Sequence, residues 1–333
     1  MLHANFLGVW EGEGLLTGIQ NPDPIWEVGV FICDSFNMNK GSLHKLIARG
    51  LVIAWGIVAA NCSTVNTLVP LPANPHRIIS LSPSITEVIF ALGAGEKLAG
   101  ITIFCNYPPE TKTIPKVAEF SRVYFEKILW QMPDLVIANR DSPAETVKDD
   151  LREYRIPFIT VSAYTIDETL EMILEIGHTI GHKQEAEKLT NDMRKRIREI
   201  ENKIQGGEGV KTVMVFGHEP LIVAGPGTFA DDMIRRAGGI NIASNSPLKY
   251  PRYSLEQILL EGPEVIIESG CGVAYGSSDI EAIWRFWGQW RNIPAVRNGR
   301  IVVFDSDIVT RPGPRIVEGF EQIASSLYPE RFQ

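Results

Sequence analysis

Two stretches of the chain, FEKILWQMPDLVI (125–137) and LEQILLEGPEVII (255–267), decide the fold. They align without gaps at a constant offset of 130 residues. Each reads as a helix that runs through a proline and an acid into a buried parallel strand. Such a connection is common in α/β proteins, but its repetition over thirteen aligned positions favours an internal duplication, and the shared pairs include Glu126/Glu256, Ile128/Ile258, Leu129/Leu259 and Pro133/Pro263. We therefore expect two similar α/β lobes.

Each lobe is predicted to begin with a strand, a loop, a helix and a second strand. In the first lobe, the β-rich run RIISL (77–81) precedes TEVIFALGAGEKLAGI (86–101), a helical pattern that is ended by two glycines. In the second lobe, TVMVF (212–216) leads towards TFAD (228–231), a capping box that opens a helix. The two halves therefore repeat one plan.

One long amphipathic helix is predicted between the lobes, over 182–204. At 1.5 Å per residue it reaches about 35 Å. It has no internal Gly or Pro, so we expect it to limit hinge motion between an N-terminal lobe at 76–181 and a C-terminal lobe at 205–333. Its apolar stripe consists of Ala186, Leu189, Met193, Ile197, Ile200 and Ile204.

The beginning of the chain carries export features. Residues 1–37 contain five acids and no Lys or Arg, which is the wrong charge for a leader, so we interpret them as an over-extended start. Residues 38–61 combine basic residues with a short apolar run, as a signal peptide does. Cys62 is a candidate lipid anchor, although the residue before it departs from the usual lipobox. A Pro- and Thr-rich linker follows over 62–75, and we expect a periplasmic or other extracytoplasmic location.

Composition narrows the classes of partner. The 333 residues include 40 acids and 32 bases, for a net charge of −8, and no long basic run. Nucleic acid is therefore not an expected partner. The four cysteines are far apart and never form a C-x-x-C, which excludes zinc-finger, ferredoxin and thioredoxin readings.

No catalytic signature is present in the sequence. We find no nucleophile–base pair, metal cluster or phosphate loop. His178 and His182 have the spacing of a zinc-binding helix, but the glutamate of H-E-x-x-H is absent, so we interpret them as capping or surface residues. We predict no enzyme, no catalytic residue, no metal site and no resident cofactor. A zinc- or manganese-binding protein and an α/β hydrolytic enzyme are the remote alternatives.

Aromatic and glycine residues follow the predicted strand ends in both lobes. In α/β folds, loops at the carboxyl ends of parallel strands line the ligand crevice. Two lobes would place such loops opposite each other, and aromatic faces supply contact area at low entropic cost. This arrangement suits a large, flat, partly apolar ligand. The residues concerned include Phe104, Tyr107, Phe120, Tyr250 and the stretch GCG at 270–272.

Four stretches resemble the vitamin B12-binding branch of the helical-backbone substrate-binding proteins that serve ABC importers, a family whose other members bind haem and ferric siderophores. The resemblance covers about residues 76–330. It implies an α/β class III periplasmic-binding-protein architecture, with two Rossmann-like lobes joined by a single long α-helix. The stretches are RIISLSPSITEVIFALGAGEKLAGIT (77–102), CNYPPETKTIPKV (105–117), MPDLVIA (132–138) and AVRNGRIVVFDSDIVTRPGPRIVEGFEQIA (295–324).

The same resemblance implies a function and a ligand site. A monomer would capture cobalamin or a related corrinoid between the lobes and deliver it to the membrane permease, with haem or a ferric siderophore as the alternative ligand. Phe104 matches an aromatic residue that contacts cobalamin, Phe120 and Tyr250 stand where cleft tryptophans are found, and Tyr107 is the candidate iron ligand if the cargo is haem. A further ligand-contacting segment coincides with Ile308, Val309, Thr310, Arg311 and Pro312.

Two further pairs have expected roles. Glu126 and Glu256 match acids that meet arginines of the permease, so the resemblance implies that they dock the lobes onto it. The alternative is local, because an acid in the first turn of a helix is stabilised by the helix dipole. Cys105 and Cys271 lie on equivalent loops of opposite lobes. We expect two independent thiols there, with a disulfide or a shared ligand contact as the alternative in an oxidising compartment.

Overall fold

The computed structural model describes residues 69–119, 122–269 and 280–333. These residues belong to one compact unit that spans 68–333. The predicted start extension, the signal peptide, Cys62 and the first part of the linker lie outside the described residues. Within the described ranges, no helix is long and apolar enough to cross a membrane.

Five parallel strands form the sheet of the N-terminal lobe, in the order β3-β2-β1-β4-β5. Nearly all side chains of β1, β2 and β4 are buried, as expected for a parallel sheet that is covered on both faces. The strands are β1 (Ile78–Ser80), β2 (Leu98–Thr102), β3 (Lys116–Ala118), β4 (Leu135–Asn139) and β5 (Phe158–Val161).

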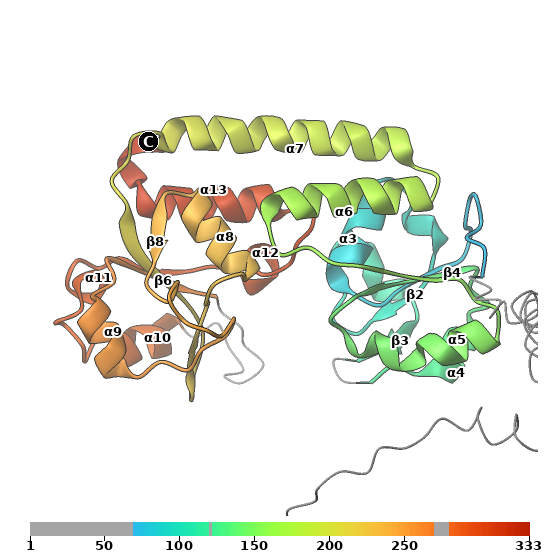
Figure 1. The fold of residues 1–333 in the computed structure, drawn as a ribbon, viewed down its shortest axis with the longest axis horizontal. Helices are drawn as coiled ribbons and strands as arrows, with labels where there is room; N and C mark the ends of the chain where they lie inside the picture. Colours follow the sequence, from blue (N-terminus) through green and yellow to red (C-terminus); the bar gives the residue numbers. More distant parts are fainter. Residues whose placement is uncertain (1–68, 120–121, 270–279) are drawn as a thin grey trace, which may run out of the picture. The chain divides into compact units, whose positions relative to one another are not determined.

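Helices cover both faces of this sheet (Figure 1). Neighbouring residues of a strand point to opposite faces. Ile78 therefore packs into a core shared with α3 and α6, whereas Ile79 packs into a second core with Ile128 of α4 and Leu151 of α5. These helices are α3 (Pro83–Ala91), α4 (Phe125–Trp130), α5 (Lys148–Glu153) and α6 (Ile166–Thr179), and short 3-10 turns lie at Gly95–Lys97, Pro109–Thr113 and Pro143–Val147.

The C-terminal lobe is built on a second sheet of five strands, in the order β10-β9-β6-β7, with β8 also paired to β6. All pairs are parallel except β6 with β7. The strands are β6 (Val210–His218), β7 (Leu221–Val223), β8 (Gly239–Asn241), β9 (Val265–Glu268) and β10 (Ile301–Val303).

Helices again cover both faces of the second sheet. Met233 of α8 and Phe320 of α13 pack into the core on one face, and Ile258 of α9 and Trp287 of α10 pack into the core on the other. The helices are α8 (Phe229–Arg236), α9 (Leu255–Glu261), α10 (Ile280–Trp287), α11 (Pro294–Arg297), α12 (Ser306–Val309) and α13 (Ile316–Leu327), followed by a 3-10 turn at Pro329–Arg331.

The two sheets share a topology. The order β2-β1-β4-β5 in the first corresponds to β8-β6-β9-β10 in the second. The helices α4 and α9 begin at Phe125 and Leu255, and the strands that follow begin at Leu135 and Val265, so the offset of 130 residues holds for both elements. The predicted α/β fold class is confirmed.

A single helix, α7 (Lys183–Ile204, 22 residues), links the two halves (Figure 1). It begins one residue later than expected, because His182 is its N-cap. Its buried face contains most of the predicted apolar stripe together with Thr190, whose hydroxyl donates to the Ala186 carbonyl at 2.8 Å. The helix packs against α6 of the N-terminal lobe and α13 of the C-terminal lobe.

The two repeated helices are followed by left-handed residues at equivalent positions, Met132 (φ 46°) and Gly262 (φ 62°). A side chain in this conformation costs about 1–2 kcal/mol. Met132 is 74% exposed, so replacing its side chain by hydrogen loses little packing energy. We expect Met132→Gly to raise the free energy of unfolding in urea by up to about 1 kcal/mol and Gly262→Ala to lower it by about 1–2 kcal/mol. An unchanged free energy of unfolding in Gly262→Ala would contradict the left-handed conformation of this residue.

Candidate ligand-binding site

The loop that follows β2 carries two of the predicted ligand residues. Tyr107 is 46% exposed and Phe104 is half-buried. The loop is fixed from below, because the Thr102 hydroxyl accepts a hydrogen bond from the Phe104 N–H at 3.3 Å and the Lys116 ammonium donates to the Cys105 carbonyl at 3.3 Å. Burial lowers the pKa of Lys116. The two aromatic side chains therefore stand on an anchored backbone.

Cys105, in the same loop, is a free and buried thiol. Its sulfur lies 3.2 Å from the hydroxyl oxygens of both Thr86 and Thr102, inside the N-terminal lobe. Its suggested partner, Cys271, lies outside the described residues, as does the predicted cleft residue Phe120.

The predicted ligand segment at 308–312 divides between the core and the surface. Val309 is fully buried in the main core, and the Thr310 hydroxyl donates to the Ser306 carbonyl at 2.6 Å. Ile308 and Pro312 are half-buried. Val309 thus anchors the segment, and the side chain of Arg311 extends from it to the N-terminal lobe.

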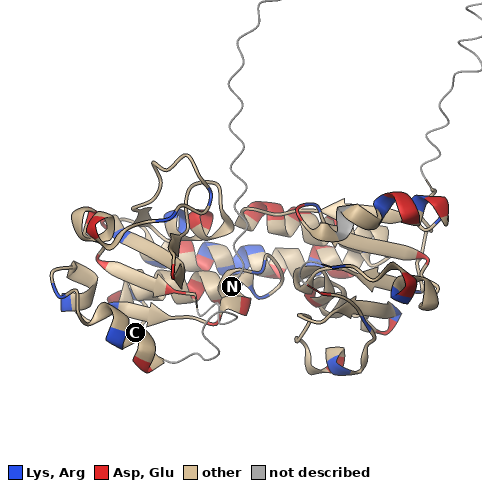
Figure 2. Cartoon of the chain, turned by 90° about the horizontal axis from the view of Figure 1, so that it is seen from below, with Lys and Arg blue, Asp and Glu red and all other residues tan. Residues whose placement is uncertain are grey.

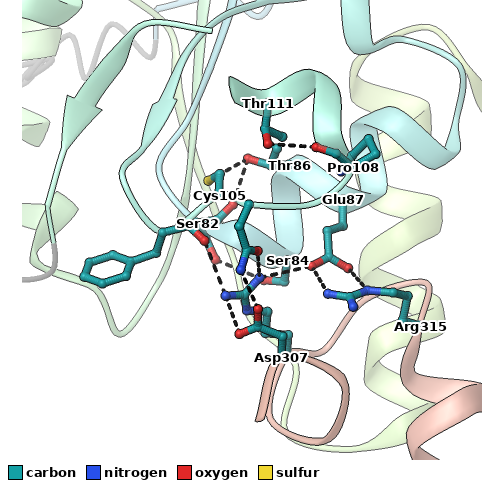
Figure 3. A network of polar contacts seen from close by, with 12 residues as sticks. Ser82, Ser84, Thr86, Glu87, Cys105, Pro108, Thr111, Asp307 and Arg315 are labelled. Atoms are coloured by element: carbon teal, nitrogen blue, oxygen red, sulfur yellow. Dashed lines mark hydrogen bonds and ion pairs between the residues drawn. The ribbon is translucent and has the colours of Figure 1, made fainter. Parts of the chain in front are cut away.

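A polar network joins this segment to the loop after β2 (Figure 3). Arg311 Nη1 donates to Asn106 Oδ1 at 2.8 Å, and Arg311 Nη2 donates to the Phe104 carbonyl at 3.3 Å. The Asp307 carboxylate accepts from Arg311 at 2.5 Å and from Asn106 Nδ2 at 2.6 Å. Residues that are 201 to 207 positions apart in the chain therefore meet here.

Glu87 of α3 is the buried centre of this network and is 4% exposed. Arg315 donates to both of its oxygens, at 2.8 and 2.7 Å, and Arg311 donates to one of them at 3.3 Å. The Arg315 guanidinium also lies 4.3 Å from the centre of the Tyr107 ring, a cation–π contact. The hydrogen bonds to Glu87 raise the pKa of Arg315. Neither Glu87 nor Arg315 was predicted, because no local pattern in the sequence marks a pair separated by 228 residues.

A second contact between the lobes involves the loops after β4, β5 and β8. The Tyr164 hydroxyl donates to the Asp141 carboxylate, and the Lys249 ammonium of the C-terminal lobe lies 4.1 Å from the centre of the Tyr164 ring. Beside it, Tyr250 is 57% exposed and packs edge-to-face on Phe216 at 5.6 Å. Partial burial of its hydroxyl and, second, the charge of Asp141 raise the pKa of Tyr250. Of these residues, only Tyr250 was predicted.

A third cluster lies at the carboxyl ends of β6 and β9. His218 Nε2 is 3.0 Å from Glu268 Oε1, which also accepts from Trp287 Nε1 at 2.5 Å. The His218 ring stacks on Phe286 at 4.1 Å. Both Glu268 and Trp287 are buried, so this cluster belongs to the interior of the C-terminal lobe.

The two predicted docking acids occupy equivalent exposed positions on α4 and α9. A capping box formed by Ser254 and Gln257 opens α9. A backbone hydrogen bond at the helix start and, second, the Ser254 hydroxyl lower the pKa of Glu256. Trp130 and Leu260 lie one helical turn further on, four residues after Glu126 and Glu256, and are 76% and 86% exposed.

Among the residues that the structure describes, no three His, Cys, Asp or Glu side chains are placed to hold a metal ion. The arrangement is suited to holding a ligand by contact. Its loops present aromatic rings, fixed guanidinium groups and carboxylates from two lobes.

The structure is that of a two-lobed binding protein. It has two α/β lobes, one long connecting helix and aromatic residues on the loops at the strand ends. The chain belongs to the periplasmic binding protein family, whose model matches residues 78–308.

Two curated relatives resemble the chain over most of its length. The vitamin B12-binding protein of Vibrio cholerae serotype O1 is 30% identical over 260 residues, which cover 78% of this chain and 90% of the relative. An uncharacterized ABC transporter substrate-binding lipoprotein, YvrC of Bacillus subtilis, is 32% identical over 276 residues, which cover 80% of this chain and 85% of the relative.

Two solved structures are similar in fold. The periplasmic vitamin B12-binding protein BtuF of Vibrio cholerae has a TM-score of 0.68 at 28% identity and covers 79% of this chain and 100% of its own. The periplasmic heme-binding protein RhuT of Roseiflexus sp. RS-1, in its apo form, has a TM-score of 0.68 at 27% identity and covers 77% of this chain and 99% of its own.

Proposed function

We propose that this protein is the substrate-binding protein of an ABC importer and that it captures cobalamin or a related corrinoid between its lobes. It acts as a monomer and passes the ligand unchanged to a membrane permease. The observation that carries the proposal is the placement of two exposed aromatic rings on strand-end loops of different lobes, Tyr107 after β2 and Tyr250 after β8. The vitamin B12-binding relatives support the choice of ligand.

The proposed wall combines Phe104 and Tyr107 from one lobe with Tyr250 and Ile308 from the other. Flat aromatic faces match the large, partly apolar surface of a corrinoid. Tyr250 rests on Phe216 and Tyr107 lies under Arg315, so both rings are backed by packed side chains before a ligand arrives. Such preorganisation reduces the entropic cost of binding.

Haem or a ferric siderophore is the second candidate, because Tyr107 offers a phenol oxygen from an exposed position. The heme-binding relative of the same fold supports this alternative. Cyanocobalamin and haemin are both coloured, so absorption titrations of the protein with each compound separate the two candidates.

We expect cyanocobalamin to bind with one-to-one stoichiometry and Phe104→Ala with Tyr250→Ala to weaken its affinity at least about tenfold, because buried aromatic contact is lost. Isothermal titration calorimetry measures both. Tyr154→Ala is the matched control, since Tyr154 is 58% exposed and lies just after α5, away from the proposed wall. An affinity within twofold of the parent protein for the double variant would remove these rings from the site.

The proposed docking surface consists of Glu126 and Trp130 on α4 and Glu256 and Leu260 on α9. Helix geometry places residues four apart on the same face, so each lobe presents one carboxylate beside one exposed apolar side chain. Figure 2 views the chain from the side of these helices and shows charges of both signs on both lobes. Carboxylates in this setting suit arginine forks of a permease.

The double reversal Glu126→Arg with Glu256→Arg is expected to abolish transport through the cognate permease and to leave ligand affinity unchanged, because the two acids contact only the membrane partner. Transport assays and calorimetry provide the two readouts. Glu187→Arg with Glu199→Arg on α7 makes the same change of charge elsewhere and is the control. Normal transport by the first variant would discard docking, and loss of ligand affinity would place these acids in the ligand site.

We further propose export by the 38–61 signal peptide and attachment through Cys62. The lipoprotein relative supports an anchor of this kind.

A further inference from the structure

We infer that Glu87 is a positioning residue that couples the loop after β2, in the N-terminal lobe, to the C-terminal lobe. Its carboxylate holds Arg311 and Arg315 in the orientations in which they grip the loop after β2. The effect of Glu87 on ligand affinity rests on the proposed function. Its effect on the loop does not.

The loop is held from the C-terminal lobe at three successive points. Arg311 binds the Phe104 carbonyl, Arg311 and Asp307 bind the Asn106 side chain, and Arg315 lies against the Tyr107 ring. Phe104 and Tyr107 belong to the proposed ligand wall. Any movement of the loop that carries these two rings therefore changes the contacts that the C-terminal lobe makes with it.

Glu87 is the group that both arginines share. It approaches from α3, beneath the loop, and its two oxygens receive three hydrogen bonds from the two guanidinium groups. Glu87 and Asp307 together balance the two cations. Without the Glu87 charge, the two partly buried arginines would lose the carboxylate that they share. Like charges repel more strongly where water is scarce.

The backbone of Arg311 and Arg315 is held in the C-terminal lobe by buried neighbours in the sequence. Val309 precedes Arg311 by two residues, and Ile316 follows Arg315 directly; both apolar side chains are fully buried in the main core. The guanidinium groups thus extend from a fixed support, and Glu87 directs where they point.

A matched control exists in another ion pair between the lobes. Arg236 of α8 and Asp167 of α6 lie 3.0 Å apart. This pair also joins the two halves, but neither residue contacts the loop after β2 in the described structure. Comparing Glu87→Gln with Asp167→Asn therefore separates an effect on the loop from the loss of any inter-lobe charge pair.

The test uses the full chain and begins without ligand. The amides of Ile103, Phe104 and Cys105 are hydrogen-bonded, so their hydrogen exchange is measurable. We expect Glu87→Gln to speed their exchange about tenfold or more relative to the amides of β4, which report global opening. Asp167→Asn is expected to leave this ratio unchanged. Asn106→Ala, at an exposed position, is expected to speed loop exchange in the same way and covers the case in which Glu87→Gln does not fold.

Ligand affinity is the second readout, measured with cyanocobalamin and with haemin. Glu87→Gln is expected to weaken whichever compound binds by about tenfold or more, and Asp167→Asn by less than twofold. Binding of neither compound would overturn the cobalamin and haem proposals, and the exchange data would still decide the role of Glu87. If Glu87→Gln leaves the ratio of loop exchange to β4 exchange as it is in the parent protein, the positioning role is overturned. Equal losses of ligand affinity in Glu87→Gln and Asp167→Asn would also overturn it.

Discussion

One uninterrupted helix, α7, limits how the two lobes can move. It has 22 residues and no Gly or Pro at which to bend, so bending it would break backbone hydrogen bonds. Its buried stripe packs against α6 of one lobe and α13 of the other. Separating either contact would expose apolar side chains such as Met193 and Ile197, at about 25 cal/mol for each Å². The lobes are therefore joined by a support that resists both bending and detachment.

Polar contacts join the lobes where their strand-end loops meet. On one side, Arg311 and Arg315 converge on Glu87, and on the other, Lys249 lies against Tyr164. Such contacts depend on distance and direction more sharply than apolar packing does. The apolar packing of α7 thus sets the approximate relation of the two lobes, and the charged groups contact the loops that carry the aromatic residues. This division suits the proposed capture of a ligand between the lobes.

Local patterns in the sequence predicted the parts of the fold that arise from local spacing. The helix at 182–204 was placed to within one residue, because its apolar side chains recur at helical intervals, and the repeat at 125–137 identified the duplicated unit. Long-range pairs left no such signal. Glu87 reads as an ordinary polar position of an amphipathic helix, yet it is buried against an arginine 228 residues away. Val309 lay in a predicted ligand segment, but tertiary packing turns it into the core.

Small-angle X-ray scattering tests the central claim that α7 holds the two lobes in a nearly constant relation. The purified protein is measured without ligand and again when saturated with whichever of cyanocobalamin and haemin binds more tightly. We expect closely similar radii of gyration and distance distributions in the two states, because α7 has no internal Gly or Pro at which to bend. A large compaction on binding, with loss of the longest intramolecular distances, would contradict it.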